Sequence, residues 1–265
     1  FKLSKSITMS NENTYASSDV VTNYSKSIYL HDPEKIVLRI LRSKLKSMNM
    51  LDIGTGAGRT SYHFRHLVKG YTGIDYSKEM VNACKKRFRN SKGKINFEVC
   101  DARSMQIFKD NKFDFILVSS NALDYISHED RLKALKEIRR VGKSGGFFLF
   151  SSHNLQSIDR LLEVPLTFNP VNMFRNIMTY SLLKILNTGF KKLKKEKYTI
   201  MNDGAHQFRL STYYIKPAEQ IKQLENEGFS VISVYSSENG AKIKKSDINA
   251  TKEGLYHGLY YFCRM

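Results

Sequence analysis

Residues 50–60 read MLDIGTGAGRT, and this stretch decides the fold. A short apolar strand comes first, and three glycines follow at alternate positions before a helix expected to begin near Thr60. Glycine is needed where the backbone takes unusual dihedral angles or lies against a ligand. A strand, such a turn and a helix N-terminus make a nucleotide-shaped slot at the carboxyl edge of a parallel sheet. The G-x-G-x-G spacing differs from the G-x-G-x-x-G that seats a dinucleotide pyrophosphate, which disfavours a dehydrogenase.

Strand and helix patterns alternate around this turn. Apolar runs typical of strands occur at 50–53, 71–75, 95–100, 113–119 and 147–151. Apolar residues at helical spacing follow Asp32-Pro33, the glycine turn, Ser77 and Asp130. This alternation predicts an α/β fold with a doubly wound, mostly parallel sheet. Two closing strands, at 229–235 and 255–263, are expected to form an antiparallel terminal hairpin and bring the sheet to seven strands.

Residues 155–205 interrupt the alternation. A short helix is expected at 157–164, an apolar helix at 172–186, and a lysine-rich stretch follows. We expect this mostly helical insertion to lie over the carboxyl edge of the sheet as a substrate lid. Residues 31–154 and 206–265 then form the nucleotide-binding domain, and residues 1–30 form a segment that covers the bound nucleotide.

The composition is that of a packed globular chain with a large positive charge. Hydrophobic residues make up 41% of the 265 residues, which argues against a disordered chain. No apolar run is long enough to span a bilayer. The formal net charge of +18 invites nucleic acid, an anionic membrane surface or an acidic substrate. Lysines solvating ordinary helix faces are the simpler interpretation, and the one we favour.

Three cysteines, Cys84, Cys100 and Cys263, are too few and too scattered for a disulfide framework or a zinc site. We expect them to be buried thiols in a reducing compartment, which favours a cytoplasmic protein. No grouping of His, Asp and Glu has the spacing of metal ligands, so no metal site is predicted.

Aspartates stand at the ends of three expected strands. Asp52 closes the first, Asp75 closes the second, and Asp101 follows the third. A carboxylate about twenty residues past the glycine turn accepts both hydroxyls of a ribose, which fits Asp75. An aspartate after the third strand is placed to receive an exocyclic amine such as that of adenine. A lone aspartate is also a common loop residue, but three in register with a glycine turn indicate a nucleoside site.

These residues together resemble the class I S-adenosylmethionine-dependent methyltransferases, over most of residues 30–155 and the terminal strand pair. Residues 50–60 look like the first motif of that family, and residues 73–77 (GIDYS) look like the second. Residues 100–102 are similar to the adenine-binding segment, and residues 113–123 resemble the fourth-strand motif, whose end meets cofactor and acceptor. Residues 139–146 resemble the turn before strand five, although the usual Leu-Lys-Pro is absent.

The resemblance implies S-adenosyl-L-methionine as cofactor and S-adenosyl-L-homocysteine as product. A slot with aspartates and aromatic rings suits the sulfonium of this cofactor. Methyl transfer is an in-line displacement from sulfur, for which the protein aligns the acceptor and excludes water. The residues expected to bind the cofactor are Tyr24, Asp52, Gly54, Thr55, Gly56, Arg59, Thr60, Asp75, Tyr76, Met80, Asp101, Ala102, Ser119 and Ser120.

Acceptor-side residues are harder to identify from sequence. His153 follows strand five and is the first choice for a base or an acceptor-orienting group, the alternative being a histidine satisfied in a loop. Asn121 and Tyr125, after strand four, face the same edge. His206, Arg209 and Tyr213 follow the insertion and are candidates to return to the pocket. Together these six residues form the predicted catalytic set.

The leading hypothesis is methylation of an O or N atom of a small-molecule acceptor, with the insertion as selectivity lid. An RNA or tRNA methyltransferase is the alternative that the charge suggests. Against it, strand four ends in residues 119–122 (SSNA), without the Asn/Asp-Pro-Pro-Tyr that clamps a base amine or the Pro-Cys of a cytosine-C5 enzyme. A non-catalytic cofactor-binding protein and a protein methyltransferase stay open, as does the oligomeric state.

Overall fold

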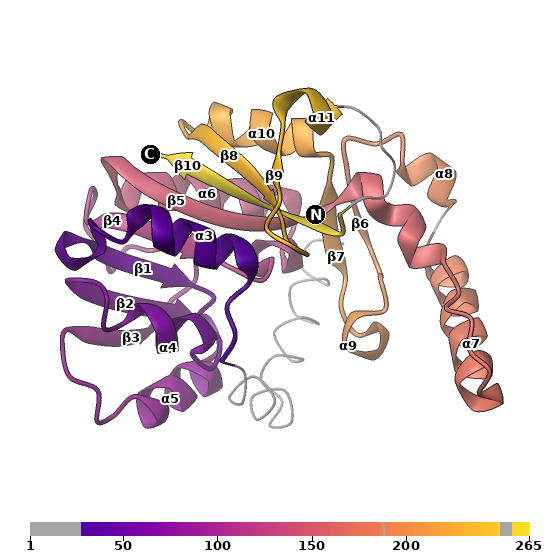
Figure 1. Ribbon diagram of the computed structural model, residues 1–265, viewed down its shortest axis with the longest axis horizontal. Helices are drawn as coiled ribbons and strands as arrows, with labels where there is room; N and C mark the ends of the chain where they lie inside the picture. Colours follow the sequence, from indigo (N-terminus) through magenta and orange to yellow (C-terminus); the bar gives the residue numbers. More distant parts are fainter. Residues whose placement is uncertain (1–27, 188, 250–255) are drawn as a thin grey trace.

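The computed structural model describes residues 28–187, 189–249 and 256–265. Within these residues a single mixed sheet of ten strands forms the centre of the molecule (Figure 1). Its main path runs in the order β3 (Ile95–Val99), β2 (Gly70–Asp75), β1 (Asn49–Ile53), β4 (Phe113–Val118), β5 (Gly142–Asn154), β10 (Gly258–Arg264), β8 (Ser230–Ser236) and β9 (Lys242–Ile243). The first five of these strands are parallel, whereas β10 is antiparallel to both β5 and β8. The expected α/β fold and its antiparallel terminal pair are confirmed.

Helices cover both faces of the sheet. On one face lie α3 (Asp32–Leu41), α4 (Arg59–Phe64) and α5 (Lys78–Arg87), which pack on Phe115 and Leu117 of β4. On the other face lie α6 (His128–Val141) and α10 (Pro217–Asn226), which pack on Ile116 and Val118. Alternate residues of the buried central strand therefore serve two separate cores, as expected for a strand covered on both sides.

Local capping explains where two of these helices begin. The Ser77 hydroxyl accepts a hydrogen bond from the Met80 amide at the start of α5, as the sequence predicted. The Ser127 hydroxyl does the same for Asp130 at the start of α6. The helix expected to begin near Thr60 is short: α4 runs from Arg59 to Phe64, and the chain continues as turns.

Strand β5 is longer than the expected 147–151 and reaches Asn154. Its body pairs with β4, and its last two residues pair with the short strand β7 (Thr212–Ile215). Strand β7 pairs in turn with β6 (Tyr198–Met201), so a hairpin joins residues on both sides of position 205. These two strands and β9 raise the count from the expected seven to ten. All four residues of β7 are buried, so no polar alternation marked it as a strand.

The segment between β5 and β7 has its own small core. It contains the 3₁₀ helix η3 (Leu155–Leu162), where an α-helix was expected, and the helices α7 (Pro170–Leu186), α8 (Phe190–Leu193) and α9 (Ala205–Phe208). Leu155, Leu183, Phe190 and Tyr214 belong to this core. Helix α7 extends away from the sheet, at the lower right of Figure 1.

Short elements complete the fold: η1 (Leu45–Ser47), η2 (Ala122–Tyr125) and α11 (Lys245–Asn249). All three cysteines are free and buried, as predicted. Within the described part of the chain, none of the helices has the length and apolarity needed to cross a membrane.

Candidate active site

A pocket opens at the carboxyl ends of β1, β2 and β4, the edge at which the sequence placed the nucleotide. Nine of the predicted cofactor residues line it: Gly54, Gly56, Asp75, Tyr76, Met80, Asp101, Ala102, Ser119 and Ser120. Tyr125, from the predicted acceptor set, lines it too. The sequence did not single out six other lining residues: Ile53, Cys100, Arg103, Ala122, Leu123 and Ile126. Most of these are apolar side chains next to a motif, and only the folded loops bring them to one wall.

The glycine turn needs its glycines. Gly54, Gly56 and Gly58 have φ angles of 68°, 54° and 88°, in the left-handed region that glycine adopts readily. A Cβ on Gly54 would lie 2.7 Å from the Cβ of Ala122, in the loop after β4. The turn therefore lies directly against the loop that follows β4. Gly54 and Gly56 have no side chains, so the backbone of the turn is exposed to the pocket.

Asp75 is fixed by the backbone around it. Its two carboxylate oxygens accept hydrogen bonds from the amides of Gly56 and Ser77, each at 2.9 Å. Burial raises the pKa of this carboxyl, while the amide donors oppose that rise. Each oxygen keeps a further lone pair, so Asp75 retains acceptor capacity toward the pocket.

Three other predicted cofactor residues lie beneath the glycine turn rather than in the pocket lining. Asp52 is buried and accepts hydrogen bonds from the hydroxyls of Thr60 and Tyr71. The Thr55 hydroxyl is 2.9 Å from that of Ser61. Burial raises the pKa of Asp52 to about 6, because no cation contacts its carboxylate and the two hydroxyls offset only part of the desolvation. These side chains hold the turn from below.

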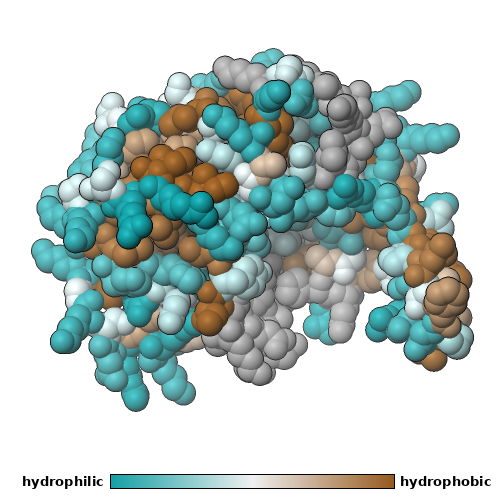
Figure 2. Space-filling model, in the orientation of Figure 1, coloured by the Kyte–Doolittle hydropathy of each residue, from teal (hydrophilic) through white to brown (hydrophobic). Residues whose placement is uncertain are grey.

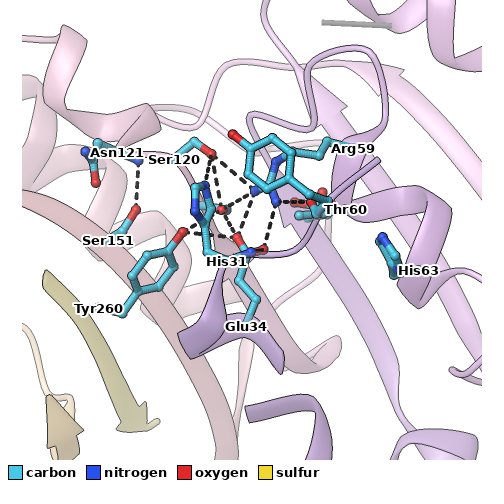
Figure 3. A network of polar contacts seen from close by, with 12 residues as sticks. His31, Glu34, Arg59, Thr60, His63, Ser120, Asn121, Ser151 and Tyr260 are labelled. Carbon is cyan, nitrogen blue, oxygen red and sulfur yellow. Dashed lines mark hydrogen bonds and ion pairs between the residues drawn. The ribbon is translucent and has the colours of Figure 1, made fainter. Parts of the chain in front are cut away.

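Arg59 is paired with a glutamate that sequence reasoning missed (Figure 3). Its two terminal nitrogens meet the two carboxylate oxygens of Glu34 at 2.8 Å each, and one of them also donates to the Ser119 hydroxyl at 2.6 Å. The Tyr260 hydroxyl donates to Glu34 at 3.1 Å. Burial alone would raise the pKa of Glu34, but the hydrogen bonds and charge of Arg59 outweigh it and hold the pKa below its usual range.

The cluster of Glu34, Arg59, Ser119 and Tyr260 joins four elements at the rim of the pocket: α3, α4, the end of β4 and β10. The sequence offered one local signal for Glu34. Its carboxylate accepts a hydrogen bond from the His31 amide at 2.9 Å, which is half of a capping box at the start of α3. Nothing in the sequence linked it to Arg59.

Asp101 lies on the pocket wall, and its carboxylate accepts hydrogen bonds from Arg103. It accepts hydrogen bonds from the backbone amide and the guanidinium of Arg103 at 2.8 Å. Arg103 also contacts Asp130 of α6 at 2.9 Å. The guanidinium holds the Asp101 loop against α6.

A histidine at the end of β5 and a buried aspartate in η2 pair beside Tyr125 of the pocket wall, without lining the pocket themselves. The Nδ1 atom of His153 lies 2.7 Å from a carboxylate oxygen of Asp124, and its Nε2 atom lies 3.0 Å from the Asn121 side-chain amide nitrogen. The His153 backbone amide donates to the same oxygen at 2.7 Å. With the proton on Nδ1 directed at Asp124, Nε2 carries the lone pair and accepts from Asn121.

Asp124 is neutralised by a buried arginine. Its second oxygen accepts hydrogen bonds from the guanidinium of Arg131 and, at 3.0 Å, from the Ser152 hydroxyl. Arg131 is fully buried and also donates to Gln220 at 2.7 Å. Sequence reasoning missed both Asp124 and Arg131. One signal was present, because Arg131 occupies the apolar stripe of α6, three, four and seven positions before Ala134, Leu135 and Ile138.

The other predicted acceptor residues are placed differently. The Tyr125 ring lies 6.5 Å from that of His153, on the pocket wall. Tyr213 is buried and does not line the pocket. Its hydroxyl lies 2.8 Å from Nδ1 of His128, and its ring lies 4.7 Å from the Arg131 guanidinium. Arg209 is exposed. His206 lies in α9, and its side chain is outside the described part of the structure. Tyr24 lies outside the described residues altogether.

Comparisons with known proteins agree with this geometry. A family model described as a methyltransferase domain matches residues 50–146. An uncharacterized methyltransferase, YcgJ of Bacillus subtilis, is 33% identical over 144 residues, which cover 50% of this chain and 54% of that protein. The uncharacterized protein MJ1252 of Methanocaldococcus jannaschii is 27% identical over 81% of this chain and 75% of its own length.

The same fold occurs in the solved structure of the Burkholderia thailandensis 1,6-didemethyltoxoflavin-N1-methyltransferase with bound 1,6-didemethyltoxoflavin and S-adenosylhomocysteine. The TM-score is 0.60 at 13% identity, over 98% of this chain and 88% of that one. Residues 50–146 match this methyltransferase domain, and the fold of the chain is that of S-adenosylmethionine-dependent methyltransferases of known structure. The chain spans about half the length of YcgJ.

The pocket fits S-adenosylmethionine as a cofactor. Asp75 is a buried carboxylate with unused acceptor capacity at the end of β2, where a ribose diol requires one. Gly54 lets the turn lie against Ala122, because a Cβ at this position would clash with the Ala122 Cβ. Met80, Ala102 and Leu123 supply apolar walls for a base. The fit therefore rests on side chains that the structure brings together, as well as on the motif.

Proposed function

We propose that this chain transfers the methyl group of S-adenosylmethionine to an O or N atom of a small-molecule acceptor. The observation that carries the proposal is the pairing of His153 with buried Asp124 at the end of β5, next to the wall formed by Tyr125 and Leu123. The cofactor supplies an activated methyl group on its sulfonium, so the protein's part is to hold the acceptor in line and exclude water.

His153 is suited to receive a proton or to orient the acceptor. Asp124 fixes the Nδ1 proton, so the lone pair lies on Nε2. An acceptor hydroxyl or amine that displaces the Asn121 amide from Nε2 would give up its proton there, and Asp124 would stabilise the resulting imidazolium. Positioned bases of this kind contribute about 10²–10⁴-fold to rate.

Residues 155–205, together with the β6–β7 hairpin, are proposed as the substrate lid. Strand β7 pairs with β5 through His153 and Tyr214, so the inserted segment is bonded directly to the strand that carries the histidine. The Tyr214 ring lies 4.9 Å from the His153 ring. A lid anchored at the catalytic strand would enclose the acceptor and exclude water.

Two observations support a small acceptor. The Burkholderia enzyme of the same fold is named for N-methylation of a small molecule. The pocket wall after β4 carries Ser119, Ser120 and Ala122, and this loop lacks the residues that clamp a flipped base. The RNA or tRNA alternative keeps the net charge of +18 as its support.

Binding of S-adenosylhomocysteine tests the cofactor half of the proposal. Titration calorimetry should give micromolar affinity for the wild-type chain and loss of binding for Asp75→Ala. A wild-type chain that does not bind would end the proposal. Measuring affinity for bulk RNA at rising salt separates the alternatives, since tight binding with a steep salt dependence would promote the RNA enzyme.

The acceptor half needs a substrate, which a metabolite screen with methyl-labelled cofactor would identify. His153→Ala should then lower turnover at least about 100-fold. His153→Asn keeps a hydrogen-bonding group without a base, so a rate near that of wild type would assign an orienting role. His66→Ala, an exposed histidine away from the pocket lining, is the control. An unchanged rate in His153→Ala would remove His153 from the reaction.

A further inference from the structure

Helix α7 presents an unusually apolar surface to solvent. Of its 17 residues only Leu183 is buried. We use the name α7 apolar surface for the exposed large side chains of this helix and of the loop before it: Leu166, Phe168, Val171, Phe174, Ile177, Met178, Leu182, Ile185 and Leu186. Half or more of the side-chain area of Val171, Phe174 and Ile185 is accessible. These residues gather on the projecting arm at the lower right of Figure 2.

Such a surface calls for a covering partner. A helix that is apolar on most of its circumference is normally buried, and contiguous apolar patches on soluble proteins mark contact sites. The packing of α7 is confined to its ends. Leu183 enters the small core of the inserted segment, and the Asn187 side chain donates to the Leu183 and Asn202 carbonyls. Among the described residues, a hydrogen bond from the Asn176 side chain to the Pro165 carbonyl holds the middle of the helix.

The charge beside this surface is mostly positive, and the nearest acidic residues along the chain are Glu163 and Glu196 at the two ends of the segment. The stretch from Val164 to Lys195 contains no Asp or Glu, and its basic residues are Arg175, Lys184, Lys191, Lys192, Lys194 and Lys195. Lys191 and Lys192 are exposed on α8, which follows α7 directly. Lys194 is paired with Asp159, so part of the cluster also anchors the segment. Apolar and cationic groups therefore occur together on one exposed arm.

We propose that the α7 apolar surface and the adjacent lysines dock this protein onto an anionic lipid bilayer, with α7 lying in the interface between headgroups and acyl chains. Apolar side chains flanked by lysines are what such an interface binds, because the former enter the acyl boundary and the latter meet anionic headgroups. The 17 residues of α7 are too few for a span, and within the described residues no helix qualifies as one.

Charge complementarity selects the bilayer over a second copy of the chain. Two α7 surfaces packed together would bring two clusters of lysines close to each other, with no acidic residue between Val164 and Lys195 to offset them. The net charge of +18 adds to that repulsion. An anionic membrane offers the opposite sign over an extended plane. The docking does not depend on which acceptor the pocket takes.

A single introduced tryptophan gives a direct reading of insertion. The chain contains no tryptophan, so Phe174→Trp carries the only indole signal. Its emission should shift to the blue on vesicles that contain phosphatidylglycerol in phosphatidylcholine, and less on phosphatidylcholine alone. Ile107→Trp, at an exposed apolar position in another part of the molecule, should show no shift.

Vesicle co-sedimentation of the full chain then separates the apolar and charged contributions. Phe174→Ser with Ile185→Ser should weaken binding at least about tenfold, while Ile107→Ser with Ile232→Ser, also exposed, should leave it unchanged. Lys191→Glu with Lys192→Glu should weaken it by a similar factor, while Lys85→Glu with Lys86→Glu, an exposed lysine pair on α5, should have little effect.

Three results would overturn the proposal. An equal loss of vesicle binding in the Lys191/Lys192 and Lys85/Lys86 variants would mean that binding depends on the net positive charge of the protein and not on the lysines beside α7. Absence of a blue shift in Phe174→Trp would mean that α7 stays outside the bilayer. A dimer in lipid-free solution that Phe174→Ser with Ile185→Ser converts to monomer, measured by light scattering, would mean that a second copy covers the surface.

Discussion

Two loops on neighbouring strands adopt the same unusual backbone with different residues. After β1, the left-handed positions are Gly54, Gly56 and Gly58, whereas after β4 they are Ser120 and Asn121, with φ of 52° and 57°. The glycines present bare backbone to the cofactor slot. The Asn121 side chain meets His153, and the Ser120 hydroxyl accepts from Arg59 at 3.2 Å. A strained backbone is used on one side for close approach and on the other to direct side chains.

The carboxylates beneath these two loops also differ, in this case in their hydrogen-bond partners. Asp52 lies under the glycine turn and is contacted by two hydroxyls, whereas Asp124 lies under the other loop and is paired with a buried guanidinium. The carboxylate under the glycine turn is thus held by neutral hydroxyl groups, although the pocket rim carries the Glu34–Arg59 ion pair. The acceptor side depends on an ion pair between η2 and α6, and each difference predicts a distinct response to substitution.

The largest effect is expected from removing the buried cation. Arg131→Met leaves the Asp124 charge buried without its partner, which should cost about 3–5 kcal/mol of unfolding free energy in urea denaturation. Adding Asp124→Asn should restore part of the loss. Lys136→Met, exposed on the same helix, should change stability by less than about 0.5 kcal/mol. A loss below about 1 kcal/mol for Arg131→Met would contradict the ion-pair account.

On the cofactor side, Gly54→Val should weaken S-adenosylhomocysteine binding about 100-fold, because a β-branched residue is strained at positive φ and its Cβ meets Ala122. Titration calorimetry measures this directly. Gly93→Val is the matched control, since Gly93 also has positive φ but open space around it. If both variants lose affinity equally, backbone strain alone accounts for the effect and the contact with Ala122 does not.

Asp52 should make stability depend on pH. Its folded pKa of about 6 exceeds the unfolded value of about 4, so the folded state binds the extra proton between these values and loses stability as pH rises through them. The unfolding free energy of Asp52→Asn relative to wild type should therefore rise by about 2–3 kcal/mol from pH 4 to pH 7. Urea midpoints at both pH values test this, with Asp247→Asn as the exposed control. A constant difference would contradict it.

The smallest effect is expected at the acceptor-side loop. Ser120→Gly relieves the left-handed strain and loses only long hydroxyl contacts with Arg59, Ser119 and His31, so stability should rise by about 0.5 kcal/mol. Denaturant midpoints against wild type give the value. A loss greater than about 1 kcal/mol would show that the hydroxyl, and not the backbone, determines this position.

Sequence reasoning succeeded where contacts are local and failed where they are distant. Gly54, Asp75 and Asp101 follow their strands directly, so the motif order gave both the fold and most of the pocket wall. Glu34 pairs with Arg59 and accepts a hydrogen bond from Tyr260, which comes from the opposite end of the described chain. Their partnership exists only once the sheet has formed.

The same reasoning explains the missed acceptor residues. Arg131 lies on the apolar face of α6, where the sequence alone gives no reason for a charged residue. The structure supplies the reason, because Arg131 forms an ion pair with Asp124. Strand β7 is short and wholly buried, so neither its length nor its alternation marked it. Asp52 was correctly placed at the end of β1, but its side chain points beneath the turn, which spacing alone does not reveal.

The hydrogen bond between Tyr260 and Glu34 joins residues 226 positions apart. At the usual pace of translation, about 5–20 residues per second, the ribosome needs about 10–45 s to add the second residue after the first. During that interval the parallel strands can pair, but Glu34 and Arg59 lack the tyrosine that completes their cluster. The Glu34 cluster at the rim of the pocket is therefore completed only as β10 enters the sheet, after all the residues that line the pocket have been synthesised.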